Sequence, residues 1–297
     1  ARAQPLVVLL AVILVSGTLV AQKNPPVEDV LRAAGEYLAS YAPRVSGVTL
    51  EEEYTLLDVS GGRVGLTRRI NSDVVLLNLG GRVVGLRDAY AVDDNPLRER
   101  APRIVTLLAK PSEAAWARAQ AYAGEFLRFF EDELIVRLNE PTLTLQFLAP
   151  ESQTRATYKV DGRKKIDGVE TVVLKFQETK IKTQAPVYIL QTPGAAVASG
   201  KLWIDPATGR VHRTELSMQS DSESAHIVVE YARNAELDLW LPSSMSDTYE
   251  GTERVGTGMS NMGAGTPGIA AARSMPASYA NAKLTPIDLR VPKGPAQ

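Results

Sequence analysis

Short apolar segments separated by tight-turn signals constrain this fold more than any other feature of the sequence. Gly-Gly pairs stand at 61–62 and 80–81, Asp-Gly pairs at 161–162 and 167–168, and Asp-Pro-Ala-Thr-Gly at 205–209. Such pairs between alternating segments indicate β-hairpins, because glycine accepts the positive φ angles that these turns require. Successive hairpins build an antiparallel sheet. The sequence therefore predicts a meander of about ten strands.

Apolar residues at helical spacing interrupt this meander in two places. The first stretch, residues 27–41, follows an Asn-Pro-Pro entry, and we expect the helix to end at Pro43. The second is a helical insertion at residues 96–150, in which Pro111-Ser112 starts one helix. Helices grouped in this way beside an antiparallel sheet indicate an α+β fold. We expect a curved sheet that forms an unclosed β-barrel, with the helices covering its concave face.

The first residues have the features of an export signal. An unbroken apolar stretch at 6–15 follows Arg2, and small residues come after it. This pattern predicts a secretory signal peptide over residues 1–21. The alternative is one uncleaved N-terminal membrane anchor, because residues 3–22 carry no charge. Both interpretations place the rest of the chain in the periplasm or another extracytoplasmic part of a bacterial envelope.

Most of the remaining chain is expected to form one domain. We predict a single half-barrel domain over residues 22–290 and a disordered tail over 291–297. Residues 251–276 contain six glycines and two prolines without any periodicity, which favours a flexible loop. Met259 and Met262 in that loop are candidate contacts to a protein partner, since flexible methionine-bearing surfaces adapt to different partners.

Composition excludes several functions. Lys and Arg number 33 against 34 Asp and Glu, for a net charge of −1, and no basic stripe is visible, so we expect no nucleic-acid partner. The chain has no cysteine, which removes thiolate nucleophiles and cysteine-bound metals. His212 and His226 are its two histidines, and no G-x-S-x-G motif accompanies them, so both are expected on the surface. We predict no metal, no cofactor and no enzymatic activity; a hydrolase of unrecognised type is the remaining enzymatic alternative.

The two densest acidic stretches are Glu51-Glu52-Glu53 and Glu131-Asp132-Glu133, and the first lies on a predicted strand. Alternation along a strand places Glu52 on the opposite face from its two neighbours. Two aligned carboxylates are too few to hold a divalent cation. A solvated strand face is the expected role of this stretch.

One hairpin resembles a known family. The segment at 200–216 reads GKLWIDPATGRVHRTEL, a strand ending in Trp-Ile-Asp, a turn ending in Thr-Gly and a return strand with Arg-x-Glu. Together with Leu-Trp-Leu-Pro at 239–242, it resembles the periplasmic lipoprotein-carrier superfamily, which serves outer-membrane lipoprotein sorting, and within it uncharacterised secreted bacterial members. The resemblance implies an unclosed antiparallel barrel with a helical lid, whose apolar concave face holds acyl chains.

Two groups of residues are candidates to line such a cavity. Val172, Leu174 and Phe176 share one face of a predicted strand, which we expect to point inward. The second group lies on an apolar stripe of a predicted helix and consists of Trp116, Phe126 and Phe130. These three residues could equally form part of the core beneath the sheet.

The sequence thus leaves two leading hypotheses for function. The first is a non-enzymatic envelope protein that binds a lipid or acyl chain in its half-barrel. The second is a structural or interaction subunit of an envelope assembly, with a filled core and an envelope protein as its partner.

Overall fold

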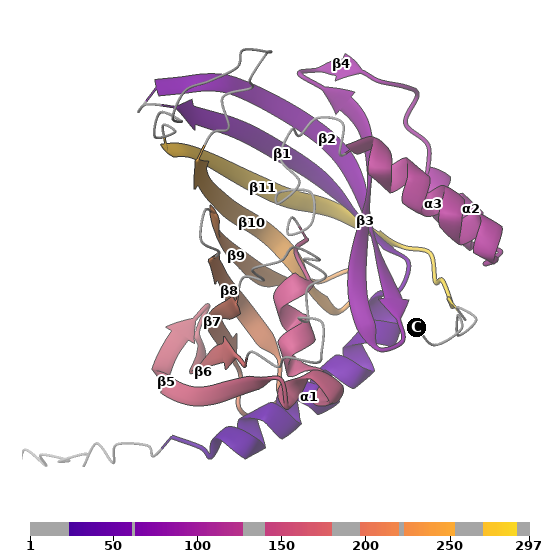
Figure 1. Cartoon of the computed structure of the whole chain (residues 1–297). Coiled ribbons are helices and arrows are strands. Elements are labelled where there is room, and N and C mark those ends of the chain that lie inside the picture. Colours follow the sequence, from indigo (N-terminus) through magenta and orange to yellow (C-terminus); the bar gives the residue numbers. More distant parts are fainter. Residues whose placement is uncertain are drawn as a thin grey trace, which may run out of the picture.

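One antiparallel sheet organises the whole molecule (Figure 1). The computed structural model describes residues 24–60, 63–126, 140–179, 197–219, 223–252 and 270–289. The sheet has 11 strands in the order β4-β3-β2-β1-β11-β10-β9-β8-β7-β6-β5, so two meanders join where β1 pairs with β11. The sheet is not closed, because β4 and β5 are its two edges. The fold is therefore the α+β unclosed barrel that the turn signals predicted.

The elements have the following bounds. The strands are β1 (Val48–Ser60), β2 (Arg63–Leu79), β3 (Arg82–Val92), β4 (Asn95–Pro96), β5 (Ala156–Ile166), β6 (Val169–Glu178), β7 (Val197–Ile204), β8 (Val211–Gln219), β9 (Glu223–Asn234), β10 (Leu239–Thr252) and β11 (Ala270–Leu284). The helices are α1 (Val27–Val45), α2 (Arg103–Leu108), α3 (Glu113–Phe126), the 3-10 helix η2 (Leu143–Leu148) and α5 (Pro150–Gln153).

Helix α1 forms the floor of the molecule. Its buried residues Val30, Ala34, Leu38 and Tyr41 recur at helical spacing and join the main core. The expected stop at Pro43 is wrong, because the helix continues to its own end at Val45 with the proline inside its last turn. Burial of the last turn against the sheet holds it in helical form despite the missing proline N–H.

Helices cover both faces of the sheet. Figure 1 shows the sheet curling around α1 and the short helices η2 and α5, whereas α2 and α3 lie outside β2 and β3. Two separate buried clusters correspond to these layers. Strand β2 supplies both, since Val74 and Leu76 point inward while Val75 and Leu77 pack against α2 and α3. The lid expected on the concave face thus consists of α1 and η2, whereas helices α2 and α3 of the expected helical insertion pack on the outer face.

Several sequence expectations lie at the limits of the described chain. Strands β10 and β11 include both ends of the expected loop at 251–276, since Thr252 pairs with Ala270. Met259, Met262 and residues 1–21 and 291–297 lie outside the described residues. Within the residues that are described, no helix is long and apolar enough to cross a membrane.

Candidate functional site

The hairpin that resembles the lipoprotein-carrier superfamily has a structural role. In its turn, Asp205 accepts hydrogen bonds from the backbone N–H of Ala207 at 2.9 Å and the hydroxyl of Thr208 at 2.6 Å. Gly209 follows with a φ of +71°, and a Cβ atom there would lie 2.0 Å from the carbonyl oxygen of Ala33 in α1. The turn therefore docks directly on α1, and the motif fixes the β7–β8 hairpin against the helix that closes the concave face.

The concave face next to this hairpin is apolar. Val172, Leu174 and Phe176 point inward as predicted and are at most 1 % exposed. The ring of Phe176 lies over Gly200 of β7, where a Cβ would come within 2.8 Å of the ring. On its other side the ring meets Phe147 of η2, with a centroid distance of 4.4 Å. The three predicted residues thus form a continuous apolar surface in contact with η2.

The segment η2 fills the concavity without pairing with the sheet. All six of its residues, LTLQFL, are buried. Side chains from two strands hold its backbone and the adjoining residues: Tyr158 of β5 donates to the Phe147 carbonyl at 2.6 Å and Tyr231 of β9 to the Pro141 carbonyl at 2.7 Å. The hydroxyl of Thr142 in turn donates to the backbone carbonyl of Val83 at 2.9 Å. A short plug held by side chains thus occupies the space in which an acyl chain was expected.

Glu52 lies on the concave face, where its carboxylate forms a buried ion pair. The alternation expected for Glu51-Glu52-Glu53 is correct, but a solvated role is wrong for Glu52, which is fully buried. Arg87 binds its carboxylate in a bidentate manner, with Nε–Oε2 at 2.8 Å and Nη2–Oε1 at 2.9 Å. Ser72 donates to Oε2 at 2.5 Å. Such burial is tolerated because several donors satisfy the carboxylate.

Asp247 and its neighbours extend this buried group. Tyr249 donates to Oδ2 of Asp247 at 3.0 Å, whereas Oδ1 has no hydrogen-bond partner among the described residues. Burial raises the pKa of Asp247 to about 7, although Tyr249 and Arg87 act in the opposite direction. We call the full set the inner polar cluster: Glu52, Ser72, Arg87, Asp247, Tyr249 and Tyr279. Sequence analysis missed it because its members come from five different strands, and only the alternation at Glu52 hinted at it.

The described side chains provide no metal centre. Among them, no three histidine, aspartate or glutamate residues come together as ligands. The inner polar cluster offers two carboxylates, and Arg87 already neutralises one of them.

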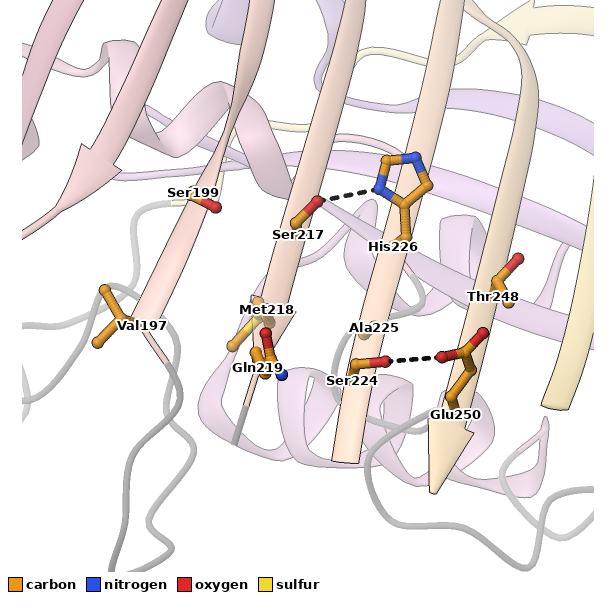
Figure 2. Close-up of a pocket in the computed structure, with 10 residues that line it drawn as sticks. All are labelled: Val197, Ser199, Ser217, Met218, Gln219, Ser224, Ala225, His226, Thr248 and Glu250. Carbon is orange, nitrogen blue, oxygen red and sulfur yellow. Dashed lines mark hydrogen bonds between the residues drawn. The ribbon is translucent and has the colours of Figure 1, made fainter. Parts of the chain in front are cut away.

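Ser217 and His226 form a pair that sequence analysis did not anticipate. Figure 2 shows them across β8 and β9, with Oγ and Nδ1 3.0 Å apart, in a pocket of about 250 Å³. Glu250 lies in the same pocket but accepts a hydrogen bond from Ser224 at 3.4 Å, away from His226. A hydrolytic triad needs a carboxylate that orients the imidazole. Among the described side chains no carboxylate bonds to His226, which is exposed.

His212 departs from the surface position expected for it. It is 1 % exposed, and neither of its ring nitrogens has a hydrogen-bond partner among the described residues. It lies where the β7–β8 register shifts, and its ring is 4.4 Å from that of Trp240. Burial lowers its pKa. A buried, neutral imidazole packed on an aromatic ring is a core residue of this fold.

Trp116 does not join the other cavity candidates. Its half-buried ring packs against the outer cluster formed by α2, α3 and β2, on the opposite side of the sheet from Leu174. Phe126 ends α3, but its side chain lies outside the described part of the chain, as does all of Phe130. The structure therefore brings together the strand candidates and separates Trp116 from them.

A second cleft, of about 730 Å³, lies on the outer face between β1, β11 and the start of α2. Its charged groups are largely paired. Arg100 binds Glu51 at 2.9 Å and Asp73 at 2.6 Å, and Asn281 donates to Glu51 at 2.8 Å. These pairs leave the cleft with no concentration of one charge.

No protein-family model matches the sequence, and no curated protein is similar to it in sequence. Solved structures do show likeness. A domain described as outer membrane lipoprotein-sorting, from Vibrio parahaemolyticus, is 12% identical, with 86% of this chain and 92% of that chain covered and a TM-score of 0.38. A DUF1329 family protein from Desulfovibrio piger is 11% identical over 88% and 94%, with a TM-score of 0.36.

A LolA superfamily protein from Nitrosomonas europaea is 11% identical over 86% of this chain and 94% of that one, with a TM-score of 0.30. Of these structures, one is thus described as lipoprotein-sorting and one as a member of the LolA superfamily. Identity and TM-scores are low for all three.

Proposed function

We propose that this chain is a non-enzymatic protein of the bacterial envelope that binds the acyl chain of a lipid on the concave face of its sheet. One observation carries the proposal: the apolar inner face around Leu174 and Phe176 is covered by η2, which does not pair with any strand. Acyl chains require only a dry, apolar surface of sufficient length. The export signal expected in residues 1–21 supports the location.

An exchange between plug and lipid explains how such a site would load and release. Each buried methylene of an acyl chain contributes about 0.8 kcal/mol. Displacement of Leu145, Phe147 and Leu148 from the concavity removes a comparable apolar contribution. The cost of displacing the plug offsets part of the gain from burying the acyl chain, so the lipid is held less tightly than in an open cavity. Hydrogen bonds from Tyr158 and Tyr231 return the plug to its closed position.

Close packing favours the second hypothesis, an interaction subunit with a filled core. Phe147 and Phe176 are in direct ring contact, and both are at most 1 % exposed. In that case η2 is permanent core, and no lipid takes its place. The two hypotheses differ in what happens when the plug is made smaller.

Substitution of Phe147 by alanine separates them. The loss of its ring opens a dry cavity against Phe176, and such cavities bind apolar ligands. We expect Phe147→Ala to bind a fluorescent fatty acid at least about 10-fold more tightly than the unsubstituted protein, because the plug no longer competes fully. Binding is measured by titration, together with the rise in melting temperature that bound ligand produces.

Leu108→Ala is the matched control. Leu108 is as deeply buried as Phe147 but belongs to the outer cluster. Its truncation costs about 2–5 kcal/mol of stability, a range that overlaps that of Phe147→Ala, without opening the concave face. If neither the unsubstituted protein nor Phe147→Ala binds the probe, the filled-core hypothesis replaces the carrier. An equal increase in fatty-acid affinity in both variants would show that the probe binds non-specifically to any destabilised core.

A further inference from the structure

Three lysines lie directly opposite one another on adjacent strands of the outer face. Lys159 of β5 pairs in register with Lys175 of β6, and Lys175 pairs with Lys201 of β7. Their inward neighbours Tyr158 and Leu174 contribute to the core, so the lysine side chains project to the outer face. Lys159 and Lys175 are exposed, and the side chain of Lys201 is 38% exposed. We call this set the lysine row.

The lysine row concentrates positive charge on a chain that is slightly acidic overall. Lys164 lies on the same face through its pairing with Thr171, and Asp161 is the one carboxylate on this face of β5, β6 and β7. On the next strand, β8, Glu215 lies opposite Lys201 and is bound by Arg213 at 2.7 Å. Asp161 binds Lys201 at 3.1 Å, and its pKa is lowered by that hydrogen bond and further by the charges of Lys175 and Lys159. On the outer face of β5, β6 and β7, four lysines against one aspartate give a charge of +3, whereas the whole chain carries −1.

Protection of the sheet edge does not account for this arrangement. Lysines on an edge strand discourage unwanted strand pairing, which explains Lys159 and Lys164 on β5. Lys175 and Lys201 lie on inner strands that are already paired on both sides. Like charges directly opposite each other destabilise a sheet. The row therefore places like charges opposite each other at two successive pairs, and only Lys201 has a carboxylate, Asp161, bound to it.

We propose that the lysine row is the surface by which this protein docks on a bilayer that contains anionic lipid headgroups. Strands are about 4.8 Å apart, so the row spans roughly 10 Å of convex surface, a width over which several headgroups meet it. All its cations are lysines, whose compact charges on flexible stems suit a diffuse array of phosphates rather than one bidentate ligand. The row was not predicted from the sequence, because its three lysines lie on three different strands.

The proposal does not depend on acyl-chain binding, since it concerns the opposite face of the sheet. Each lysine near an anionic membrane surface contributes about 1 kcal/mol, so removal of three lowers affinity roughly 100-fold. The test compares the full chain with the triple variant Lys159→Gln, Lys175→Gln, Lys201→Gln. Binding is measured by co-sedimentation with phosphatidylcholine vesicles containing about 30% phosphatidylglycerol, at about 0.1 M salt.

A matched variant removes the same charge elsewhere. Lys110→Gln, Arg118→Gln, Lys283→Gln alters three exposed cations far from β5, β6 and β7 and should retain vesicle binding within about 2-fold. Pure phosphatidylcholine vesicles offer the same acyl chains without the charge and should bind neither variant nor the unsubstituted protein. The lysine-row variant should also melt at the same temperature or higher, because repulsion between lysines is removed.

Two results would overturn the proposal. One is the absence of binding to anionic vesicles by the unsubstituted protein. The other is an equal loss in the two triple variants, which would mean that net charge alone acts. Failure of fatty-acid binding, by contrast, would contradict only the proposed function.

Discussion

Gly209 is a residue at which both the turn conformation and the packing against α1 exclude a side chain. It combines a φ of +71° with contact to the backbone of α1, so any Cβ would be strained and would collide with the Ala33 carbonyl. We expect Gly209→Ala to destabilise the protein by about 2 kcal/mol or more, since backbone atoms cannot move aside as a side chain can. Urea unfolding measures the change.

Gly168→Ala provides the comparison for this effect. Gly168 also has a positive φ, of +84°, but a Cβ there meets nothing within 4 Å. Its cost should reflect conformation alone, about 1 kcal/mol. Equal losses in the two variants would show that the turn does not press on α1.

Asp247 makes stability depend on pH in a direction unusual for a carboxyl group. Its pKa in the folded protein is about 7, above the ordinary value of 3.8, because burial disfavours the charged form. The folded state therefore holds a proton that the unfolded state releases, and stability falls as pH rises toward and through 7. Asp247→Asn, which stays neutral, should lose less stability than the unsubstituted protein between pH 5 and pH 8. The expected difference is on the order of 2 kcal/mol.

Unfolding in urea at the two pH values gives this difference. Asp238→Asn is the control, since Asp238 is exposed and its pKa is lowered by Arg233, which confines its titration to acid pH. If stability changed with pH equally in Asp247→Asn and in the unsubstituted protein, Asp247 would not titrate between pH 5 and pH 8 in the folded state.

At the scale of elements, the local sequence signals predicted the positions of helices and strands correctly but not the residues at which they begin and end. Ser112 accepts a hydrogen bond from the Ala115 N–H at 3.1 Å, as expected where a helix starts after Pro111. The segments at 63–70 and 74–79 belong to one long strand, β2, which also includes the polar residues between them. Asn71 and Ser72 between them have low intrinsic preference for a β-strand. Both nevertheless pair with β1, because strand pairing in the folded sheet outweighs the preference of single residues.

The outer face of β2 also determines where helices α2 and α3 pack. A helical stripe such as that around Trp116 indicates burial but not the surface that buries it. Val75 and Leu77 provide an apolar outer surface, and α2 and α3 pack there. Pattern alone therefore placed Trp116 beside Phe176, whereas the sheet separates them.

For the whole molecule, the junction of β1 with β11 makes the two meanders one structure. Strands from opposite ends of the described chain pair from Val48–Leu284 to Ser60–Ala271. Strand β1 is paired on both sides, whereas β5 has an unpaired edge. We expect the slowest amide hydrogen exchange in β1 and the adjoining part of β11, and the fastest strand exchange in β5. Faster exchange in β1 than in β5 would show that the meanders open separately at the junction.

Turns, alternation and helical faces were readable from the sequence because each depends on residues within a few positions of one another. Asp205 with Gly209 indicated a tight turn, and the alternation of Val172, Leu174 and Phe176 identified the buried face. These local signals determined the antiparallel architecture. The motif at 200–216 was recognisable because the turn has strict steric requirements.

Only the tertiary structure decided which distant residues meet. The Glu52–Arg87 pair, the burial of the Asp247 carboxyl group and the lysine row each depend on side chains that lie on different strands. Their energies arise from burial and from charges a few ångströms apart, and both depend on strand register. Sequence spacing carries no record of that register, so the apolar face was predictable and the charged groups on both sides of it were not.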